Sequence, residues 1–425
     1  MFAEQIKEDL YNCLKCAMCQ PVCPTYKVTR MERHAPRGRI QMVKHYLEGD
    51  LSISRGLQEA LMSCILCEAC SASCPSGVRL DRVFENMRTE LHERLGAAVP
   101  KKVLFTALTN PILLRLGARV VRMGMEVFPV PLGLKVGNIP FGRLPRFNAT
   151  PFKSSVGRTI PARGKRKARM IYFTGCATDL VNEDVGRATL HVLTDLGIEV
   201  EVPPEQVCCS APMFLAGARR QALSNIRTNL ELLDRDDVDA VMVDCATCGA
   251  ALRKSIPHLM EDLGEDTDKA RRVAGKVKDI SEIVAEHLEE LELQGGGGKN
   301  KIRVTYNDPC HLVRSMKVSA APRKVLTALP EVDLKEMAGS DQCCGGAGSF
   351  QFDYKEISAA VTARKKESIH ATGAKIVATG CPGCRLTLSG NLCGAEDPVV
   401  LHTVQLVARA LNTRPQGRNL QDPDA

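Results

Sequence analysis

The sequence predicts a multidomain α + α/β protein, with an α-helical N-terminal domain followed by two tandem α/β domains. Three observations lead to this prediction. The chain has 425 residues, enough for two or three domains. Its 19 cysteines fall into two repeated patterns, a short one near the N-terminus and a long one that occurs twice afterwards. Strand-like and helix-like stretches alternate in the part that carries the long pattern.

The composition is that of a globular protein with an excess of cysteine. Hydrophobic residues make up 44% and charged residues 25%, which is ordinary for a folded domain. We expect neither a signal peptide nor a transmembrane helix, and therefore a cytoplasmic protein, because the sequence lacks the apolar runs that these need. In a reducing compartment, this many cysteines indicate metal or redox sites rather than disulfides. The formal net charge of +8 comes without a basic stripe interleaved with aromatics, so no nucleic-acid partner is expected.

Eight cysteines near the N-terminus predict two [4Fe–4S] clusters. Each set of four follows the pattern C-x2-C-x2-C-x3-C-P, which is typical of bacterial ferredoxins. In two-cluster ferredoxins the fourth cysteine of each run ligates the other cluster. The alternative, a pair of zinc sites, is disfavoured because zinc normally uses separated cysteine pairs. The first cluster is predicted at Cys13, Cys16, Cys19 and Cys74, and the second at Cys64, Cys67, Cys70 and Cys23.

Residues 1–95 are expected to form a helical ferredoxin domain around these clusters. Between the two motifs, Ile40, Val43 and Leu47 recur at the spacing of an amphipathic helix. The sequence therefore predicts helices rather than strands between the two cluster motifs.

Residues 96–168 are expected to form a connector that is rich in Pro, Gly and Arg. Within it, the segment 103–128 is apolar but is interrupted by Pro111 and three arginines. One interpretation is an interfacial amphipathic helix that contacts a membrane or a partner. The other is a connector helix packed on its own chain, which we favour because it needs no further partner.

Ten of the remaining cysteines form the longer pattern. Each copy has one cysteine, a Cys-Cys pair after 31 or 32 intervening residues, and a C-x2-C pair after 35 or 36 more. The copies are offset by 134 to 136 residues, which predicts two similar domains. Metal sites are predicted at Cys176, Cys208, Cys209, Cys245 and Cys248, and at Cys310, Cys343, Cys344, Cys381 and Cys384. The last cysteine, Cys393, is expected to be a buried, small apolar residue.

Residues 169–294 and 300–415 are expected to form α/β domains with mostly parallel strands. Strands are expected at 169–175, 239–244, 302–308 and 374–380, and helices at 184–196, 213–234, 268–292 and 354–371. The strands end just before the single cysteine and the C-x2-C pair of each copy, where open α/β sheets place their ligands. Each copy should therefore gather its five cysteines in one crevice. The glycine run 295–298 predicts a flexible linker between the copies.

These patterns resemble a known family. The five-cysteine pattern is similar to the cysteine-rich CCG domain found in the B and D subunits of heterodisulfide reductase. It is also similar to that of the iron–sulfur subunits of glycolate oxidase, D-lactate dehydrogenase and anaerobic glycerol-3-phosphate dehydrogenase. A double ferredoxin module ahead of two CCG domains covers essentially the whole chain. The segments most similar to the glycolate oxidase and lactate-oxidising members are PRGRIQMVKHYLEGD (36–50), CEACSASCPSGV (67–78), NDPCHL (307–312) and QCCGGAGSF (342–350).

The resemblance implies an iron–sulfur electron-transfer subunit of an oxidoreductase. It implies a separate FAD-binding dehydrogenase subunit that oxidises glycolate or D-lactate. The electron acceptor would be a quinone, an electron-transfer flavoprotein or another acceptor. Such partners would hold the protein at the inner face of the membrane. Complete CCG motifs bind non-cubane [4Fe–4S] clusters in the heterodisulfide reductase branch, so one or two further clusters are implied, with zinc or free thiols as the alternative. Two other functions stay open: a heterodisulfide-reductase-like subunit with a catalytic cluster, and an anaerobic glycerol-3-phosphate dehydrogenase subunit.

Four further features have a defined expectation. His311 follows Cys310 and either hydrogen-bonds a cluster sulfur or is an ordinary loop histidine. Arg37 and Arg39 either face an acidic partner surface or hold the start of their helix. The glycines of GGAGS (345–349) lack the context of a dinucleotide-binding loop and are expected to let the backbone approach a cluster.

Overall fold

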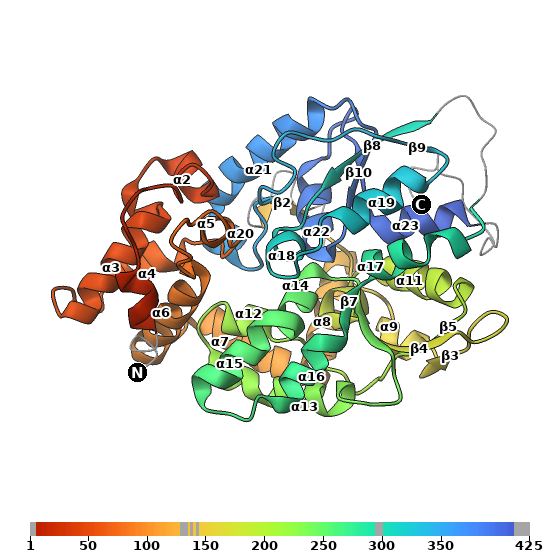
Figure 1. Cartoon of the computed structure of the whole chain (residues 1–425), viewed down its shortest axis with the longest axis horizontal. Helices are drawn as coiled ribbons and strands as arrows, with labels where there is room; N and C mark the ends of the chain where they lie inside the picture. Colours follow the sequence, from red (N-terminus) through yellow and green to blue (C-terminus); the bar gives the residue numbers. More distant parts are fainter. Residues whose placement is uncertain (1–5, 128–134, 137–138, 142–143, 294–300, 412–425) are drawn as a thin grey trace.

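The computed structural model describes residues 6–127, 135–136, 139–141, 144–293 and 301–411. A helical module at the N-terminal end packs against two α/β modules, which also pack against each other (Figure 1). The expected combination of a helical domain and two α/β modules with mostly parallel sheets is therefore confirmed. The glycine run 295–298, predicted to be a linker, lies outside the described residues.

The N-terminal module contains helices and no strand within residues 6–95. Its helices are α1 (Lys7–Tyr11), α2 (Pro24–Thr29), α3 (Pro36–Glu48), α4 (Arg55–Met62), α5 (Ala69–Ala72) and α6 (Leu80–Leu95). Ile40 and Val43 of α3 pack with Leu61 of α4 and Phe84 of α6 in one buried core. This core confirms the amphipathic periodicity seen in the sequence, and the cysteine motifs lie in the loops around it and in the short helix α5.

Arg39 is wholly buried, so it does not face a partner. Its Nε donates to the carbonyl oxygen of Ala60 at 2.7 Å, and its Nη2 donates to the hydroxyls of Ser63 at 3.1 Å and Thr25 at 3.3 Å. Arg39 therefore joins α3 to α2 and α4. Arg37, by contrast, is at the surface and donates to Glu32 at 2.7 Å, in the turn just before its helix.

The connector contributes to both neighbouring modules. It contains α7 (Val99–Thr109), α8 (Pro111–Val127), β1 (Lys135–Val136), β2 (Ile139–Pro140), α9 (Phe152–Ser155) and β3 (Thr159–Ile160). Phe105 and Leu108 of α7 are buried in the core of the first α/β module. Among the described residues no single helix is long and apolar enough to cross a bilayer. The pair α7 and α8 meets that test only together, and it is bent by 118° at its break.

The first α/β module has a five-stranded sheet in the order β3-β5-β4-β6-β7. Its strands after β3 are β4 (Ala168–Phe173), β5 (Ile198–Glu201), β6 (Ala240–Val243) and β7 (Val277–Asp279), all parallel, whereas β3 is antiparallel to β5. Its helices are α10 (Gly175–Leu180), α11 (Glu183–Asp195), α12 (Ala211–Phe214), α13 (Arg219–Leu233), α14 (Ala246–Ala250), α15 (Ile256–Leu263), α16 (Asp268–Lys276) and α17 (Ile280–Glu286).

The helix expected over 268–292 is wrong in its centre. The chain there forms α16, then the strand β7, then α17. Val277 and Asp279 alternate as buried residues of the edge strand β7, and Asp279 caps α17 by accepting from the backbone N–H of Ser281 at 2.9 Å. The cap formed by Asp279 thus begins a new helix, α17, where the apolar spacing predicts one continuous helix.

The second α/β module repeats the plan with an all-parallel sheet in the order β11-β10-β8-β9. Its strands are β8 (Ile302–Asn307), β9 (Val332–Leu334), β10 (Ile376–Thr379) and β11 (Val399–His402). Its helices are α18 (Cys310–Arg314), α19 (Ala320–Ala328), α20 (Phe350–Asp353), α21 (Lys355–His370), α22 (Pro382–Asn391) and α23 (Thr403–Ala410). In both modules, the two central strands run parallel and end at the same edge of the sheet.

We predict that Arg39→Met lowers the free energy of unfolding by about 1–3 kcal/mol, because it leaves buried oxygen atoms without their donors. Arg33→Met is the matched control, since Arg33 is exposed and its contact with Glu59 is as long as 3.9 Å. Anaerobic thermal unfolding followed by circular dichroism measures both. Equal unfolding midpoints for the two variants would contradict the structural role given to Arg39.

Candidate iron–sulfur sites

Two cavities in the helical module are each lined by four cysteines. One is lined by Cys13, Cys16, Cys19 and Cys74, which we call site 1. The other is lined by Cys23, Cys64, Cys67 and Cys70, which we call site 2. The structure thus brings together the two sets expected from the motif, including the exchange of the fourth cysteine between the runs.

The two cysteine loops share an unusual backbone conformation. Lys15 and Ala17, on either side of Cys16, have φ angles of 57° and 67°. Leu66 and Glu68 occupy the same positions around Cys67, with φ angles of 55° and 60°. Left-handed turns at four non-glycine residues cost energy, so packing must hold the loops in this form. Such turns curl each loop around its cavity.

One thiol at each cavity shows how burial opposes ionisation there. Burial, with repulsion from neighbouring thiolates, raises the pKa of Cys19 to about 11. Burial, followed by the charges of Cys64 and Cys67, raises the pKa of Cys70 well above its usual value. None of the 19 cysteines forms a disulfide. Four converging thiols that repel each other when ionised fit a positively charged metal centre, which stabilises thiolates.

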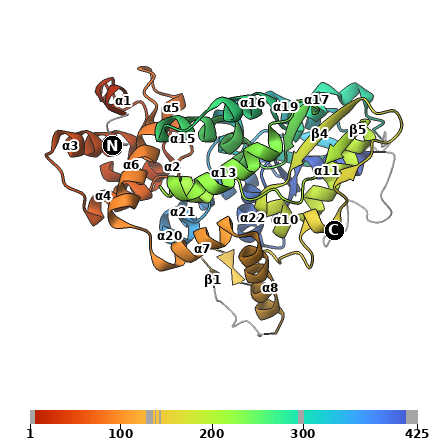
Figure 2. The same ribbon diagram turned by 90° about the horizontal axis from the view of Figure 1, so that it is seen from below.

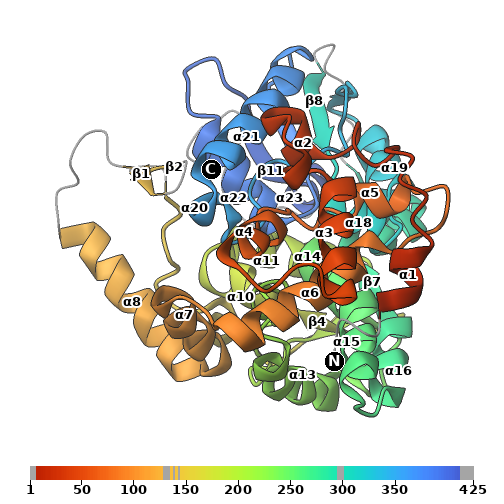
Figure 3. The ribbon, with the colours of Figure 1, turned by 90° about the vertical axis from the view of Figure 1, so that its left-hand side faces the viewer.

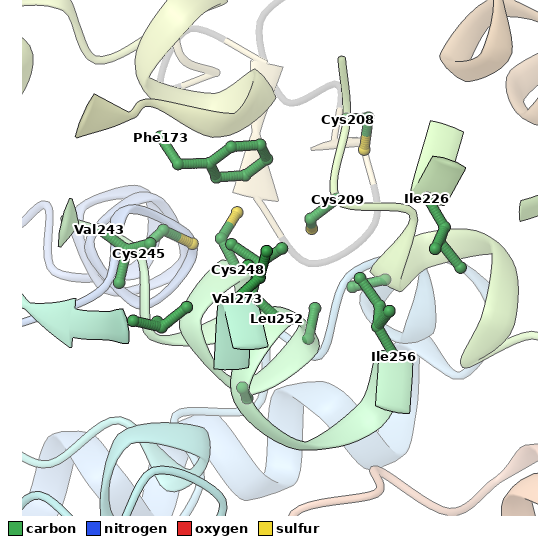
Figure 4. Close-up of a cluster of buried hydrophobic side chains, with 14 of the residues drawn as sticks. Phe173, Cys208, Cys209, Ile226, Val243, Cys245, Cys248, Leu252, Ile256 and Val273 are labelled. Carbon is green, nitrogen blue, oxygen red and sulfur yellow. The ribbon is translucent and has the colours of Figure 1, made fainter. Parts of the chain in front are cut away.

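The first five-cysteine site lies at the carboxyl ends of β4 and β6. Cys176 lies in α10 directly after β4, and the C-x2-C pair of Cys245 and Cys248 follows β6. The Cys208 thiol lies 3.9 Å from that of Cys176, and the Cys209 thiol is within hydrogen-bonding reach of Cys208 and Cys248. Figure 4 shows four of these cysteines among apolar side chains such as Phe173.

Gly175 shows how tightly this first site is packed. Its φ angle is +62°, and a Cβ atom at this position would lie 2.7 Å from the sulfur of Cys248. A side chain there would be strained and would also displace the sulfur. The backbone at the end of β4 therefore approaches the site directly.

The second five-cysteine site repeats this arrangement at the ends of β8 and β10. Cys310 begins α18 after β8, while Cys381 and Cys384 follow β10. Cys343 and Cys344 are in contact with each other, Cys343 also with Cys310, and Cys344 also with Cys384. In each module the five cysteines thus gather at the carboxyl ends of the two central strands, as the sequence predicts.

The glycines that follow Cys344 allow the loop to pack closely against its neighbours as well as to approach the site. The Gly345 N–H donates to the sulfur of Cys343 at 3.3 Å. A Cβ atom at Gly345 would lie 2.2 Å from the hydroxyl of Thr362, and one at Gly346 would lie 2.2 Å from that of Thr387. The loop is therefore pressed between α21 and α22, which the sequence did not indicate.

The four sites lie next to one another. Cys67 of site 2 belongs to the same buried apolar cluster as Cys343, and Cys310 packs against that cluster. Cys245 and Cys381, one from each α/β module, belong to the same buried apolar cluster, and each thiol shifts the pKa of the other. Cys19 of site 1 and Cys70 of site 2 pack against the same core of the helical module. These contacts give the order site 1, site 2, the second five-cysteine site and the first five-cysteine site.

His311 lies where three modules meet, and both of its ring nitrogens face oxygen atoms rather than sulfur. Its Nε2 is 3.4 Å from the carbonyl oxygen of Leu66, and its Nδ1 is 3.3 Å from the hydroxyl of Thr247. Burial alone would lower the pKa of His311, but the charges of Cys310 and Glu68 outweigh it and raise this pKa. The histidine therefore bridges site 2 and the C-x2-C loop of the first α/β module.

Buried polar contacts hold the site 2 loop against the α/β modules. Lys254 of the first module reaches Glu68 at 2.8 Å and Asp81 at 2.7 Å. From the second module, Arg314 donates to the carbonyl oxygen of Cys67 at 3.2 Å, and Ser315 donates to Glu68 at 2.7 Å. The sequence does not indicate these residues, because nothing in their spacing marks them as partners of a distant loop.

Cys393 is exposed, so the expectation that it is buried is wrong. It follows α22 in the loop before β11, where Gly394 donates its backbone N–H to Asp397 at 2.8 Å. We expected burial because a lone thiol is apolar, but the apolar character of Cys393 does not reveal the polar turn in which it lies. Cys393 lies outside all four cysteine groups.

Comparisons with known proteins agree with this arrangement. The family described as a 4Fe-4S dicluster domain matches residues 9–78, and the family described as a cysteine-rich domain matches residues 170–253 and 304–389. The probable glycolate oxidase iron-sulfur subunit of Bacillus subtilis is 31% identical over 412 residues, which cover 91% of this chain and 90% of that protein.

Two further relatives match over nearly their whole length. The glycolate oxidase iron-sulfur subunit of Escherichia coli is 27% identical, over 95% of this chain and 94% of its own. The D subunit of the dihydromethanophenazine:CoB–CoM heterodisulfide reductase of Methanosarcina mazei is 26% identical, over the same shares of the two chains. The extent and identity of the first match show that this chain belongs to the same family as the glycolate oxidase iron–sulfur subunit.

Proposed function

We propose that this chain is the iron–sulfur electron-transfer subunit of a flavin-dependent dehydrogenase that oxidises a 2-hydroxy acid, with glycolate and D-lactate as the candidate substrates. The observation that carries the proposal is the series of four cysteine sites, in which Cys67 adjoins the second five-cysteine site and Cys245 adjoins Cys381. The family supports the same role, since the similar bacterial proteins are named as iron–sulfur subunits of glycolate oxidase.

Each site has a defined set of residues for an iron–sulfur group. Sites 1 and 2 would each hold a [4Fe–4S] cubane, and each five-cysteine site would hold a non-cubane [4Fe–4S] cluster. Such clusters supply one-electron transfer when they are bound. The chain itself contributes the thiolates, the apolar surroundings and the contacts that fix neighbouring sites at short separation.

Oxidation of a 2-hydroxy acid needs a hydride acceptor, which we assign to FAD on a partner protein. Site 1 is suited to face such a partner, because Cys16 is exposed. Leu14 and Met18 flank it with exposed fractions of 75% and 59%. An exposed apolar rim around a redox centre is typical of a docking surface for another protein. The acceptor for the electrons, in this proposal, is a quinone, an electron-transfer flavoprotein or another redox protein.

A second candidate function is disulfide reduction of the heterodisulfide reductase type. The specific observation in its favour is that both five-cysteine sites are complete and adjoin each other through Cys245 and Cys381. The similarity to the D subunit of a heterodisulfide reductase extends over 95% of this chain. A partner flavoprotein that oxidises hydroxy acids would decide against this candidate.

We predict about 16 iron atoms per chain after anaerobic purification, four for each site. Iron and acid-labile sulfide analysis measures this number. About eight iron atoms with two zinc ions would contradict the assignment of clusters to the five-cysteine sites.

We also predict that Cys384→Ser changes the spectrum of one five-cysteine site and leaves the signals of sites 1 and 2 in place. Cys384 belongs to the second five-cysteine site, whereas the exposed Cys393 belongs to none. Cys393→Ser is therefore the matched control and should retain the full iron content and spectrum. Low-temperature electron paramagnetic resonance is the measurement. Equal iron loss in both variants would argue against the ligand role of Cys384.

The functional test is to identify the partner. An anaerobic pull-down of the full chain should recover an FAD-binding protein, and the clusters of the complex should be reduced by glycolate, D-lactate or L-lactate. The expected result is cluster reduction by at least one of these acids and none in the chain alone. Cluster oxidation by a disulfide substrate, without any response to hydroxy acids, would instead establish the second candidate.

A further inference from the structure

Helix α8 stands away from the body of the molecule (Figures 2 and 3), and it carries a stripe of exposed apolar side chains. Ile112, Val120 and Met123 have exposed fractions of 76%, 61% and 63%, and Leu113 and Leu116 are exposed as well. Folded chains rarely leave so many large apolar side chains side by side in water. The stripe therefore needs a covering surface that the described part of the chain does not provide.

The position of the stripe on the helix is fixed by how α8 begins and by its opposite side. Pro111 occupies the first turn, and the side chain of Asn110 accepts from the backbone N–H of Ile112 at 3.0 Å and of Leu113 at 3.2 Å. Leu114 packs against the core of the first α/β module. At about 100° per residue, Ile112, Leu116 and Met123 lie nearly opposite Leu114. The helix thus has one side on the protein and its apolar side outward.

The charges next to the stripe come from three arginines. Residues 111–125 contain Arg115, Arg119 and Arg122 and no acidic residue, and Glu126 follows them in the last turn of α8. Arg115, Arg119 and Arg122 fall within a narrow arc that borders the apolar stripe, because they are three or four residues apart. The structure thus combines an exposed apolar stripe with a cationic border.

We propose that α8 binds in the plane of a lipid bilayer that contains anionic headgroups. The stripe from Ile112 to Met123 lies at the boundary of the acyl chains, and Arg115 and Arg119 reach the phosphate groups. Two observations favour this surface over a groove on another protein. The stripe carries no polar side chain to form hydrogen bonds with a protein partner. The arginines at its border attract the phosphate groups of lipids with a net negative charge. The bend of 118° after α7 allows the helix to lie along the surface without crossing it.

The packing of α7 on the protein connects membrane binding by α8 to the rest of the chain. Phe105 and Leu108 fix α7 in the core of the first α/β module. Because α8 follows directly, binding of α8 would orient the whole chain on the membrane. The connector segment that the sequence suggests packs on its own chain through Phe105 and Leu108 of α7 and through Leu114 of α8. This inference goes beyond the proposed function and does not rest on it.

The test is flotation of the anaerobically purified full chain with vesicles of two compositions. One is phosphatidylcholine alone, and the other also contains phosphatidylglycerol. We expect binding chiefly to the anionic vesicles, with an affinity that falls as salt is added. Leu116→Gln with Met123→Gln should lower the partition coefficient about tenfold, and Arg119→Gln should lower it about fivefold on anionic vesicles only.

Matched controls come from exposed residues far from α8. Leu51→Gln with Val399→Gln removes two exposed apolar side chains, and Lys375→Gln removes one exposed charge. Both controls should bind as the unmodified chain does. Iron content, measured in every sample, reports whether a variant has folded. If the double apolar variant does not fold, vesicle binding by Arg119→Gln alone tests the proposal.

Three outcomes would overturn the proposal. The first is that the folded chain binds neither kind of vesicle. The second is that the α8 variants and the controls bind equally well. The third is that the α8 variants keep vesicle binding but lose a partner protein in pull-downs, which would make the stripe a protein interface.

Discussion

The packing of the Cys64–Cys70 loop into the junction between the two α/β modules is the contact on which the rest of the arrangement depends. It brings Cys67 next to the cluster of apolar residues that includes Cys343, and it places His311 between Leu66 and Thr247. The charges of Lys254 and Glu68 are satisfied within the same junction. Without this contact, the helical module and the α/β modules would be separate redox units on one chain.

The sequence predicts the grouping of the cysteines because ligand spacing is a local property. Each run of four curls into one loop, and each long pattern marks the ends of two parallel strands. What the sequence does not show is how the groups meet. The approach of Cys245 to Cys381 and the burial of Arg39 depend on residues far apart in the chain, and no local spacing records them. The strand β7 escapes prediction for the same reason, because it pairs with the distant strand β6.

Two of the exposed apolar surfaces have different characters. Leu14 and Met18 surround an exposed cysteine of site 1, where another redox protein could approach. The stripe of α8 has no cysteine beside it on the helix and is bordered by arginines instead. One surface is therefore suited to electron exchange and the other to attachment. A relay that is held on a membrane by one helix keeps its redox end free for a partner.

The central claim is that the four sites form one continuous series rather than independent centres. Electron paramagnetic resonance of the fully reduced chain tests it most directly, because unpaired spins on neighbouring centres interact at short range. We predict broadened or split signals in the unmodified chain. We also predict that Cys310→Ser narrows the signal of the neighbouring site 2. A spectrum that equals the sum of separate, unsplit signals, unchanged in the other sites by Cys310→Ser, would contradict the series.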